Sequence, residues 1–255
     1  MRKIITLFTL MFCMFATAQE VAVGEFLYIY HSDKTVEQIS VSEIDSLKFV
    51  EVETVQSPDS SSAALQYVAI DLGLPSGIKW ASCNVGATTP EEAGGYFAWG
   101  EIEEKENYGW ENYIWCNGSG LSLTKYCVKE GYGTVDNKTL LDVENDVARA
   151  VCGGNWRMPT TAEMQELIDN CTWEWTSVND VEGYRVIGSN GNNIFLPATG
   201  LNDNDAVENV GIGYYWSVSV ADDDDCSCGL SFDNGMKGCC NYKRFYGLTV
   251  RPVCE

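Results

Sequence analysis

Four cysteines near the C-terminus could form a thiolate metal site or take part in disulfides. Cys226 and Cys228 are separated by one residue, whereas Cys239 and Cys240 are adjacent. Zinc sites usually separate the cysteines of a pair by two to four residues, so this spacing disfavours zinc. Adjacent cysteines bond poorly to each other, which makes cross-pairing between the two clusters the easier geometry.

The other cysteines, which are spread over most of the chain, could likewise form disulfides, stay free or bind a metal. An exported protein meets an oxidising compartment, where an even number of cysteines favours a disulfide framework. Loss of a signal peptide that contains Cys13 would leave ten of the 11 cysteines. Free thiols and a metal site stay open as alternatives, and the connectivity cannot be deduced. The disulfide candidates are Cys83, Cys116, Cys127, Cys152, Cys171, Cys226, Cys228, Cys239, Cys240 and Cys254.

A run of four carboxylates, Asp222 to Asp225, could bind a cation or be a solvated edge. Calcium takes oxygen ligands of this kind, and its candidate ligands are Asp222, Asp224 and Asp233. The run lacks the spaced Asp-x-Asp-x-Asp-Gly pattern of a calcium loop, which favours a solvated loop. We therefore expect no cofactor, with calcium as the open alternative.

Charge and histidine content limit the function classes. His31 is the single histidine, so a Ser-His-Asp, Cys-His or multi-His site would have to include it. No Asp or Glu is singled out for glycoside hydrolysis by an apolar setting, no catalytic constellation can be assembled, and we expect no enzyme. The chain carries 16 Lys and Arg against 37 Asp and Glu, with a net charge of −21. This excess argues against nucleic acid and against anionic membrane surfaces as partners.

The elements that would position these residues follow an expected signal peptide at residues 1–18. A cationic start, an apolar run and a small-residue cleavage site predict export. Cleavage would remove two cations and lower the net charge from −21 to −23. No stretch is long enough for a transmembrane helix. The remaining expected parts are a small β-rich module (19–55), a Ser-rich linker (56–65) and one large domain (66–255).

Two helices are predicted in the large domain. The first carries an apolar face and the second a capping box, Thr160 with Glu163. The apolar positions of the first are Leu140, Val143, Val147 and Val151, with Asp142 as cap. Those of the second are Met164, Leu167, Ile168 and Cys171.

Strand patterns dominate the rest. They predict strands at 26–30 and 36–41, a hairpin of 184–187 with 194–196, and later strands at 214–220, 229–232 and 248–253. Helices followed by strands predict an α+β fold with a twisted antiparallel sheet.

Several motifs resemble the Fibrobacter succinogenes major paralogous domain family, in order along residues 66–255. The resemblance implies a C-type-lectin-like fold and a surface location, and it implies no reaction. Residues 44–49 also resemble a short module found ahead of such domains in exported Bacteroidetes proteins. The motifs that carry the family resemblance are 71–77, 80–87, 94–101, 156–160, 196–200, 215–217 and 247–253.

The segment 217–246 is the expected ligand-binding surface, because it departs most from a regular strand pattern. Tyrosine and phenylalanine would supply rigid contacts, and Asp and Asn adaptable polar ones, to an unknown protein or glycan ligand at the cell exterior. The expected binding residues are Trp216, Asp222, Asp223, Asp224, Asp225, Asn241, Tyr242, Phe245 and Tyr246.

Other functions stay open for this segment and for the N-terminal module. The domain could bind carbohydrate through calcium, or the chain could be a structural subunit of a surface fibre. In the fibre reading, residues 19–55 contact a fibre or envelope partner.

The composition of the segment suggests a further hypothesis. Retroelements diversify some C-type-lectin-like proteins near the C-terminus and leave Asn, Asp, Ser, Gly, Cys, Tyr and Phe. Residues 222–235 and 238–246 show that bias, with Lys243 outside it. Surface loops are rich in the same residues for ordinary reasons.

Overall fold

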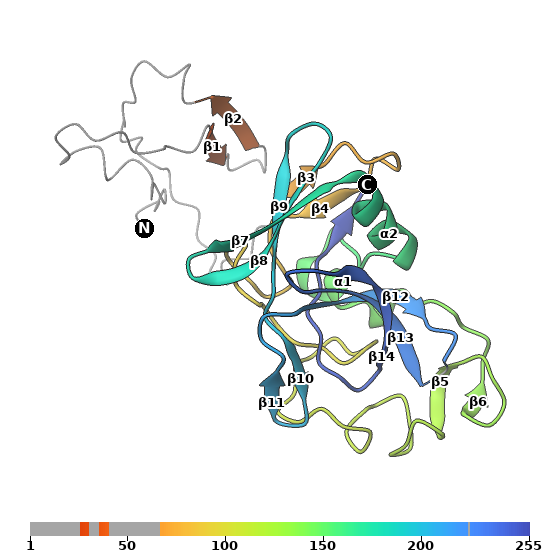
Figure 1. Ribbon diagram of the computed structural model, residues 1–255. Coiled ribbons are helices and arrows are strands. Elements are labelled where there is room, and N and C mark those ends of the chain that lie inside the picture. Colours follow the sequence, from red (N-terminus) through yellow and green to blue (C-terminus); the bar gives the residue numbers. More distant parts are fainter. Residues whose placement is uncertain (1–25, 31–35, 41–66, 224) are drawn as a thin grey trace, which may run out of the picture. The chain divides into compact units, whose positions relative to one another are not determined.

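A computed structural model describes residues 26–30, 36–40, 67–223 and 225–255 (Figure 1). The chain divides into two compact units, Met1–Ser61 and Ser62–Glu255. In the first unit, β1 (Phe26–Tyr30) and β2 (Val36–Ser40) form an antiparallel pair, as predicted from the sequence. The expected signal peptide, the linker at 56–65 and His31 lie outside the described residues.

The second unit is an α+β domain built of two α-helices and several small, mostly antiparallel sheets. The predicted single sheet is therefore wrong in its extent. One sheet has the order β15–β4–β3, one β7–β8–β9 and one β12–β13–β14. The strands of the first two sheets are β3 (Ala69–Asp71), β4 (Lys79–Ala81), β15 (Val253–Cys254), β7 (Thr172–Val178), β8 (Val181–Ile187) and β9 (Asn193–Pro197).

The remaining described strands of the second unit form one three-stranded sheet and two two-stranded pairs. β12 (Gly213–Val220), β13 (Cys226–Phe232) and β14 (Lys237–Lys243) run side by side (Figure 1). β10 (Leu201–Asp203) pairs with β11 (Ala206–Glu208), and β5 (Leu123–Cys127) pairs in parallel with β6 (Gly133–Val135). Of the strand predicted over 248–253, only Val253 belongs to a regular strand, β15. Pro252 has no N–H to donate, and Leu248 and Thr249 form isolated bridges to different segments, at Phe97 and Tyr215.

The second predicted helix is confirmed as α2 (Thr161–Asn170). The Thr160 side chain accepts from the Glu163 N–H at 3.2 Å, and the Glu163 carboxylate accepts from the Thr160 N–H at 2.8 Å. This reciprocal cap starts the helix, and Met164 and Leu167 on its apolar stripe are buried.

The first predicted helix is wrong in its boundaries and in its apolar face. α1 (Val147–Cys152) begins four residues later, after a short 3₁₀ turn (Val143–Asn145), and its cap is Asp146 rather than Asp142. Leu140, Val143 and Val151 are 51%, 65% and 44% exposed. Asp146 fixes the start because its carboxylate accepts from the N–H groups of Ala148, Arg149 and the distant Met158.

Glu163 gives a pH-dependent contribution to stability. Burial acts to raise its pKa, but hydrogen bonds from Arg157 and Thr160 outweigh burial and hold the pKa below its usual value. A depressed folded-state pKa means that the contribution is complete above the unfolded pKa, near 4.3, and is lost as the pH falls through the folded one. Glu163→Gln should lower the free energy of unfolding by about 1–2 kcal/mol at pH 7.

Urea unfolding of both proteins from pH 7 to pH 3 measures this effect. The difference in free energy of unfolding between the wild-type chain and Glu163→Gln should shrink towards zero at the acid end. Glu174→Gln, on the exposed side of β7, is the control, and its free energy of unfolding should stay close to the wild-type value at every pH. A wild-type advantage that persists unchanged at pH 3 would contradict the assignment.

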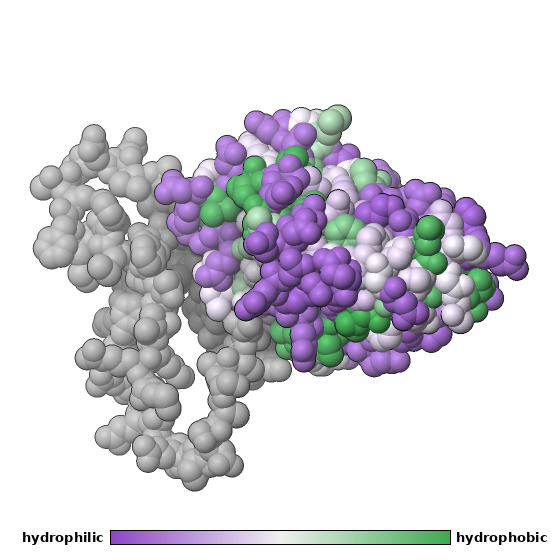
Figure 2. Space-filling view, turned by 90° about the horizontal axis from the view of Figure 1, so that it is seen from below, coloured by the Kyte–Doolittle hydropathy of each residue, from purple (hydrophilic) through white to green (hydrophobic). Residues whose placement is uncertain are grey.

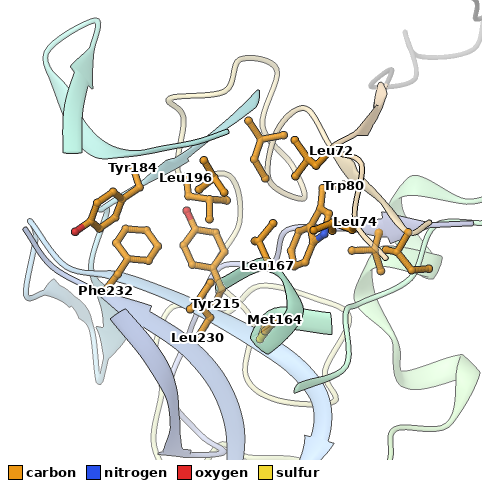
Figure 3. Packing of buried hydrophobic residues seen from close by; sticks show 14 of the residues in the cluster. Leu72, Leu74, Trp80, Met164, Leu167, Tyr184, Leu196, Tyr215, Leu230 and Phe232 are labelled. Carbon is orange, nitrogen blue, oxygen red and sulfur yellow. The ribbon is translucent and has the colours of Figure 1, made fainter. Parts of the chain in front are cut away.

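Two of the four apolar clusters among the domain's described residues include residues of the sheet β12–β13–β14. The first joins α2 to β4, β8, β9, β12 and β13 through side chains that include Trp80, Leu167, Tyr184, Tyr215 and Phe232 (Figure 3). The second contains Trp99, Tyr126, Met158 and Trp216. The sheet β12–β13–β14 therefore contributes side chains to both clusters, one from each of its faces.

Candidate ligand-binding surface

The predicted binding segment 217–246 is largely a sheet rather than a set of loops. It contains most of β12 and all of β13 and β14, joined by two short turns. Trp216 lies opposite Gly229, and Gly229 lies opposite Cys240. Since directly opposite residues point to the same face of a sheet, this register decides which side chains lie together.

One face of the sheet is closed by the first apolar cluster. Tyr215, Leu230 and Phe232 point to this face and pack with α2 and β8. The alternation of strand β14 places Asn241 on the same side, where its Oδ1 lies 3.6 Å from the Cys228 Sγ. Asn241 and Tyr242, both predicted binding residues, therefore lie on opposite faces of the sheet.

The other face gathers three half-buried tyrosines. Tyr214 comes from β12, Tyr242 from β14 and Tyr246 from the turn after it. The rings of Tyr214 and Tyr242 are 5.4 Å apart and perpendicular. Exposed Cys240 and half-buried Ser231 belong to the same face by register. We name Tyr214, Ser231, Cys240, Tyr242 and Tyr246 the tyrosine face.

Glycine at position 229 lets the Tyr242 ring lie across the sheet. A Cβ on Gly229 would come within 2.7 Å of the Tyr215 carbonyl oxygen and 3.4 Å of the Tyr242 ring. The Tyr242 ring instead reaches the strand beyond, with its centroid 6.3 Å from that of Trp216.

Trp216, a predicted binding residue, cannot touch a ligand. It is fully buried, and its indole N–H donates to the Phe97 carbonyl at 2.8 Å. The Trp99 indole donates in turn to the Ser217 carbonyl, also at 2.8 Å. This end of the face is therefore covered by the segment around residues 97–99, and the buried Trp216, which points to the same face, packs beside Tyr242.

Arg244 positions the turn that carries Phe245 and Tyr246. Its buried guanidinium donates to the carbonyls of Cys226 at 3.0 Å and Tyr126 at 2.9 Å, and it lies 5.0 Å from the Trp99 ring centroid. Hydrogen bonds to a charged donor are stronger than neutral ones, so this anchor makes the turn rigid.

Phe245 has a packing role beside the tyrosine face. Its ring lies 5.0 Å from that of Trp110 and 4.5 Å from that of Tyr246. These contacts fix the direction of the Tyr246 ring. The structure thus places Phe245 against Tyr246 and Tyr242 against Tyr214, and the binding role of these residues stays a prediction.

The three tyrosines are neutral hydrogen-bonding groups at neutral pH. Burial is the main cause that raises each pKa, followed by the carboxylate of Asp233 for Tyr214 and that of Asp203 for Tyr246. In the described part of the chain, the hydroxyls of Tyr214 and Tyr246 make no hydrogen bond. Half-buried rings with available hydroxyls suit recognition of another surface.

The acidic run lies at the opposite end of β13 from Asp233. Asp222 and Asp223 are exposed in the turn between β12 and β13, and Asp224 lies outside the described residues. Asp225 is less exposed because its carboxylate forms an ion pair with Lys243. Among the described members, the structure therefore favours a solvated turn and a structural pair over a cation site.

The three calcium candidates cannot share one ion. Asp222 precedes β13 and Asp233 follows it, so seven extended residues separate them by about 20 Å. The Asp233 Oδ1 already accepts from the N–H groups of Gly235 at 2.7 Å and Met236 at 2.8 Å. Among the described residues, no group of three or more His, Cys, Asp or Glu is arranged to hold a metal ion.

The ten cysteines proposed for disulfides are all free thiols in this structure. The register explains why the two C-terminal clusters do not cross-pair directly. Cys226 lies opposite Lys243, Cys239 opposite Leu230 and Cys240 opposite Gly229. No cysteine of β13 thus faces a cysteine of β14, and a diagonal pair exceeds the usual Cβ separation of a disulfide.

A separate hollow of about 200 Å³ lies beside α1. Its lining includes Leu140, Val143, Asp146, Arg149 and Met158. Arg149 and Asp146 are within 3.8 Å of each other, so the two charges at the rim offset one another. The hollow has about the volume of one side chain.

The face of the domain seen in Figure 2 is mostly hydrophilic. On that face, hydrophilic side chains are interrupted by small hydrophobic patches (Figure 2). In the described residues, no helix is long and apolar enough to cross a membrane.

The chain matches no protein-family model, no curated protein and no solved structure. The functional proposal therefore rests on the geometry of the described residues.

Proposed function

We propose that this chain is an exported protein that binds a ligand at the cell exterior through the tyrosine face. One observation carries the proposal: tyrosines from three separate segments converge on one sheet face, and two of them keep their hydroxyls available. Tyrosine supplies a large, rigid contact at a low cost in conformational entropy, which is why paratopes are rich in it. The buried anchor Arg244 and the supporting Trp216 hold the rings in place before a ligand arrives.

The motifs quoted above support a C-type-lectin-like domain of the Fibrobacter succinogenes major paralogous type. The small sheets, the two helices and the C-terminal position of the tyrosine face agree with such a domain. The cationic start of the chain and the apolar run after it support export.

The exposed positions of the segment are compatible with diversification by a retroelement. Asp222, Asp223, Asn234, Cys240 and Asn241 are exposed and can change at little cost to folding. Cys226, Ser227, Leu230, Phe232 and Arg244 are buried and cannot. An adjacent reverse transcriptase gene with a near-copy template repeat is expected in the genome, and the absence of both would refute diversification.

A glycan and protein array, probed with the mature chain, tests the binding function. The expected result is selective binding that survives removal of calcium by a chelator, because the carboxylate candidates do not converge. The segment 213–246, which contains every residue of the tyrosine face, should transfer that selectivity when it is grafted onto a related domain. Unchanged selectivity of the recipient would reject the tyrosine face as the binding surface.

An assembly role is the second candidate, and the β1–β2 pair favours it. An isolated two-stranded hairpin is marginally stable, so it gains by adding to another sheet. Deletion of residues 19–55 should leave ligand binding by residues 66–255 intact while it abolishes incorporation into a surface fibre. Loss of ligand binding in the deletion variant would argue against this division of roles.

A further inference from the structure

The tyrosine face is bordered by carboxylates from three neighbouring elements. Asp203 ends β10, Glu208 ends β11 and Asp233 follows β13. Asp203 comes close to Tyr246 because Asn202 and Gly247 exchange backbone hydrogen bonds of 2.7 Å and 2.9 Å. Within the described residues, none of the three carboxylates forms an ion pair with a cationic side chain.

The cations of the same sheet do not offset these charges. Lys243 lies near enough to Tyr246 to act on its hydroxyl, but its charge is paired with that of Asp225, and the Arg244 guanidinium is buried against the Trp99 ring. Lys237 lies on the other face of the sheet, 5.6 Å from the Trp173 ring centroid. The border of the tyrosine face is therefore negative, in a chain whose net charge is −21.

Three aromatic rings with a negative border discriminate between ligand classes. A guanidinium or ammonium group gains both from the π-faces of tyrosine and from nearby carboxylates. An anionic ligand meets repulsion from the border, and a neutral glycan can donate hydrogen bonds to it but gains no charge–charge attraction. The charge complementarity selects a cationic partner.

We propose that the tyrosine face binds an arginine- or lysine-rich segment of a partner protein. The inference rests on the proposed function, since it names the class of ligand for the same surface. The border charges guide the partner to the face, and the rings provide the short-range contact.

The test uses the full chain and a synthetic peptide of six Arg-Gly repeats, with a Glu-Gly repeat peptide and maltoheptaose as comparisons. A variant with Asp203→Asn, Glu208→Gln and Asp233→Asn removes three border charges and keeps side-chain shape. A matched variant with Glu130→Gln, Glu174→Gln and Asp180→Asn makes the same charge change at exposed positions of the 129–131 loop and the β7–β8 hairpin. Dissociation constants are measured by calorimetry at 50 and 300 mM salt.

We expect the Arg-Gly peptide alone to bind, with an affinity about tenfold weaker in the border variant and less than twofold weaker in the matched variant. Higher salt should narrow that difference. Equal losses in the two variants would show diffuse attraction to the net charge and overturn the inference. Preferred binding of maltoheptaose would overturn it too, while leaving the binding function standing.

The proposed function fails under a different result. If an array ligand binds equally well to the wild-type chain and to the double variant Tyr214→Ser and Tyr246→Ser, then that ligand does not bind at the tyrosine face, and the proposed function is refuted. Results from the border variant and the matched variant refute only the cationic nature of the ligand, and they do not refute ligand binding at the tyrosine face.

Discussion

Arg251→Lys is expected to lower the free energy of unfolding by about 4 kcal/mol. Arg251 is 1% exposed. Its Nε donates to Asn84 Oδ1 at 2.8 Å, and its Nη2 donates to the Phe195 carbonyl at 2.8 Å. Its Nη1 donates to the carbonyls of Ala81 at 3.0 Å and Ser82 at 3.1 Å. One guanidinium thus joins the 81–84 segment, β9 and the C-terminal segment.

Lysine keeps the charge but cannot reproduce this arrangement. Its ammonium is compact and carries three donors, so several buried acceptors would lose their partner. Urea unfolding measures the loss, and Arg185→Lys is the control because Arg185 is exposed on β8. The free energy of unfolding of Arg185→Lys should differ from that of the wild-type chain by less than about 0.5 kcal/mol. Equal midpoints for Arg251→Lys and the wild-type chain would contradict the assigned role.

Combined substitution of Tyr214→Ser and Tyr246→Ser should weaken ligand binding by about 100-fold, since central aromatic anchors each contribute more than about 1 kcal/mol. The rings are half-buried, so the double variant should stay folded with a loss of about 1–2 kcal/mol. The measurement is the dissociation constant for the ligand found on the array.

Tyr132→Ser provides the matched control. Tyr132 is a half-buried tyrosine in the loop between β5 and β6 and is not part of the tyrosine face. Its replacement should leave the dissociation constant within twofold of the wild-type value. Similar losses in Tyr132→Ser and in the double variant would show that general destabilisation, rather than lost contact, weakens binding.

The helix α2 and the β8–β9 hairpin were predicted correctly because each is determined by residues that are close together in the sequence. The capping box of Thr160 and Glu163 is complete within one helical turn, and α2 is found where it was expected. The Asn190-Gly191 turn likewise predicts the β8–β9 hairpin. In these cases the residues that decide the structure are close in the chain.

Distant partners explain the errors. The start of α1 depends on Asp146, whose second role is to bind the Met158 N–H on another segment. β14 has the residues Lys-Gly-Cys-Cys-Asn-Tyr-Lys, which show no apolar alternation, so its strand character comes from pairing with β13.

The sequence named several residues of the proposed binding surface but not the way in which the sheet arranges them. Tyr242, Phe245 and Tyr246 were expected to contact a ligand, and in the structure Phe245 packs against Tyr246 and Tyr242 against Tyr214. Tyr214 was missed because only the β12–β13–β14 register brings it to Tyr242. The alternation of Tyr214 and Trp216 along one strand was the available signal.

Hydroxyl-radical footprinting of the full chain, with and without its array ligand, tests the central claim most directly. The ligand should protect Tyr214, Tyr242 and Tyr246 from oxidation and leave Tyr132 unprotected. Protection confined to other surfaces, such as the hollow beside α1, with the three tyrosines oxidised as in the free chain, would contradict binding at the tyrosine face.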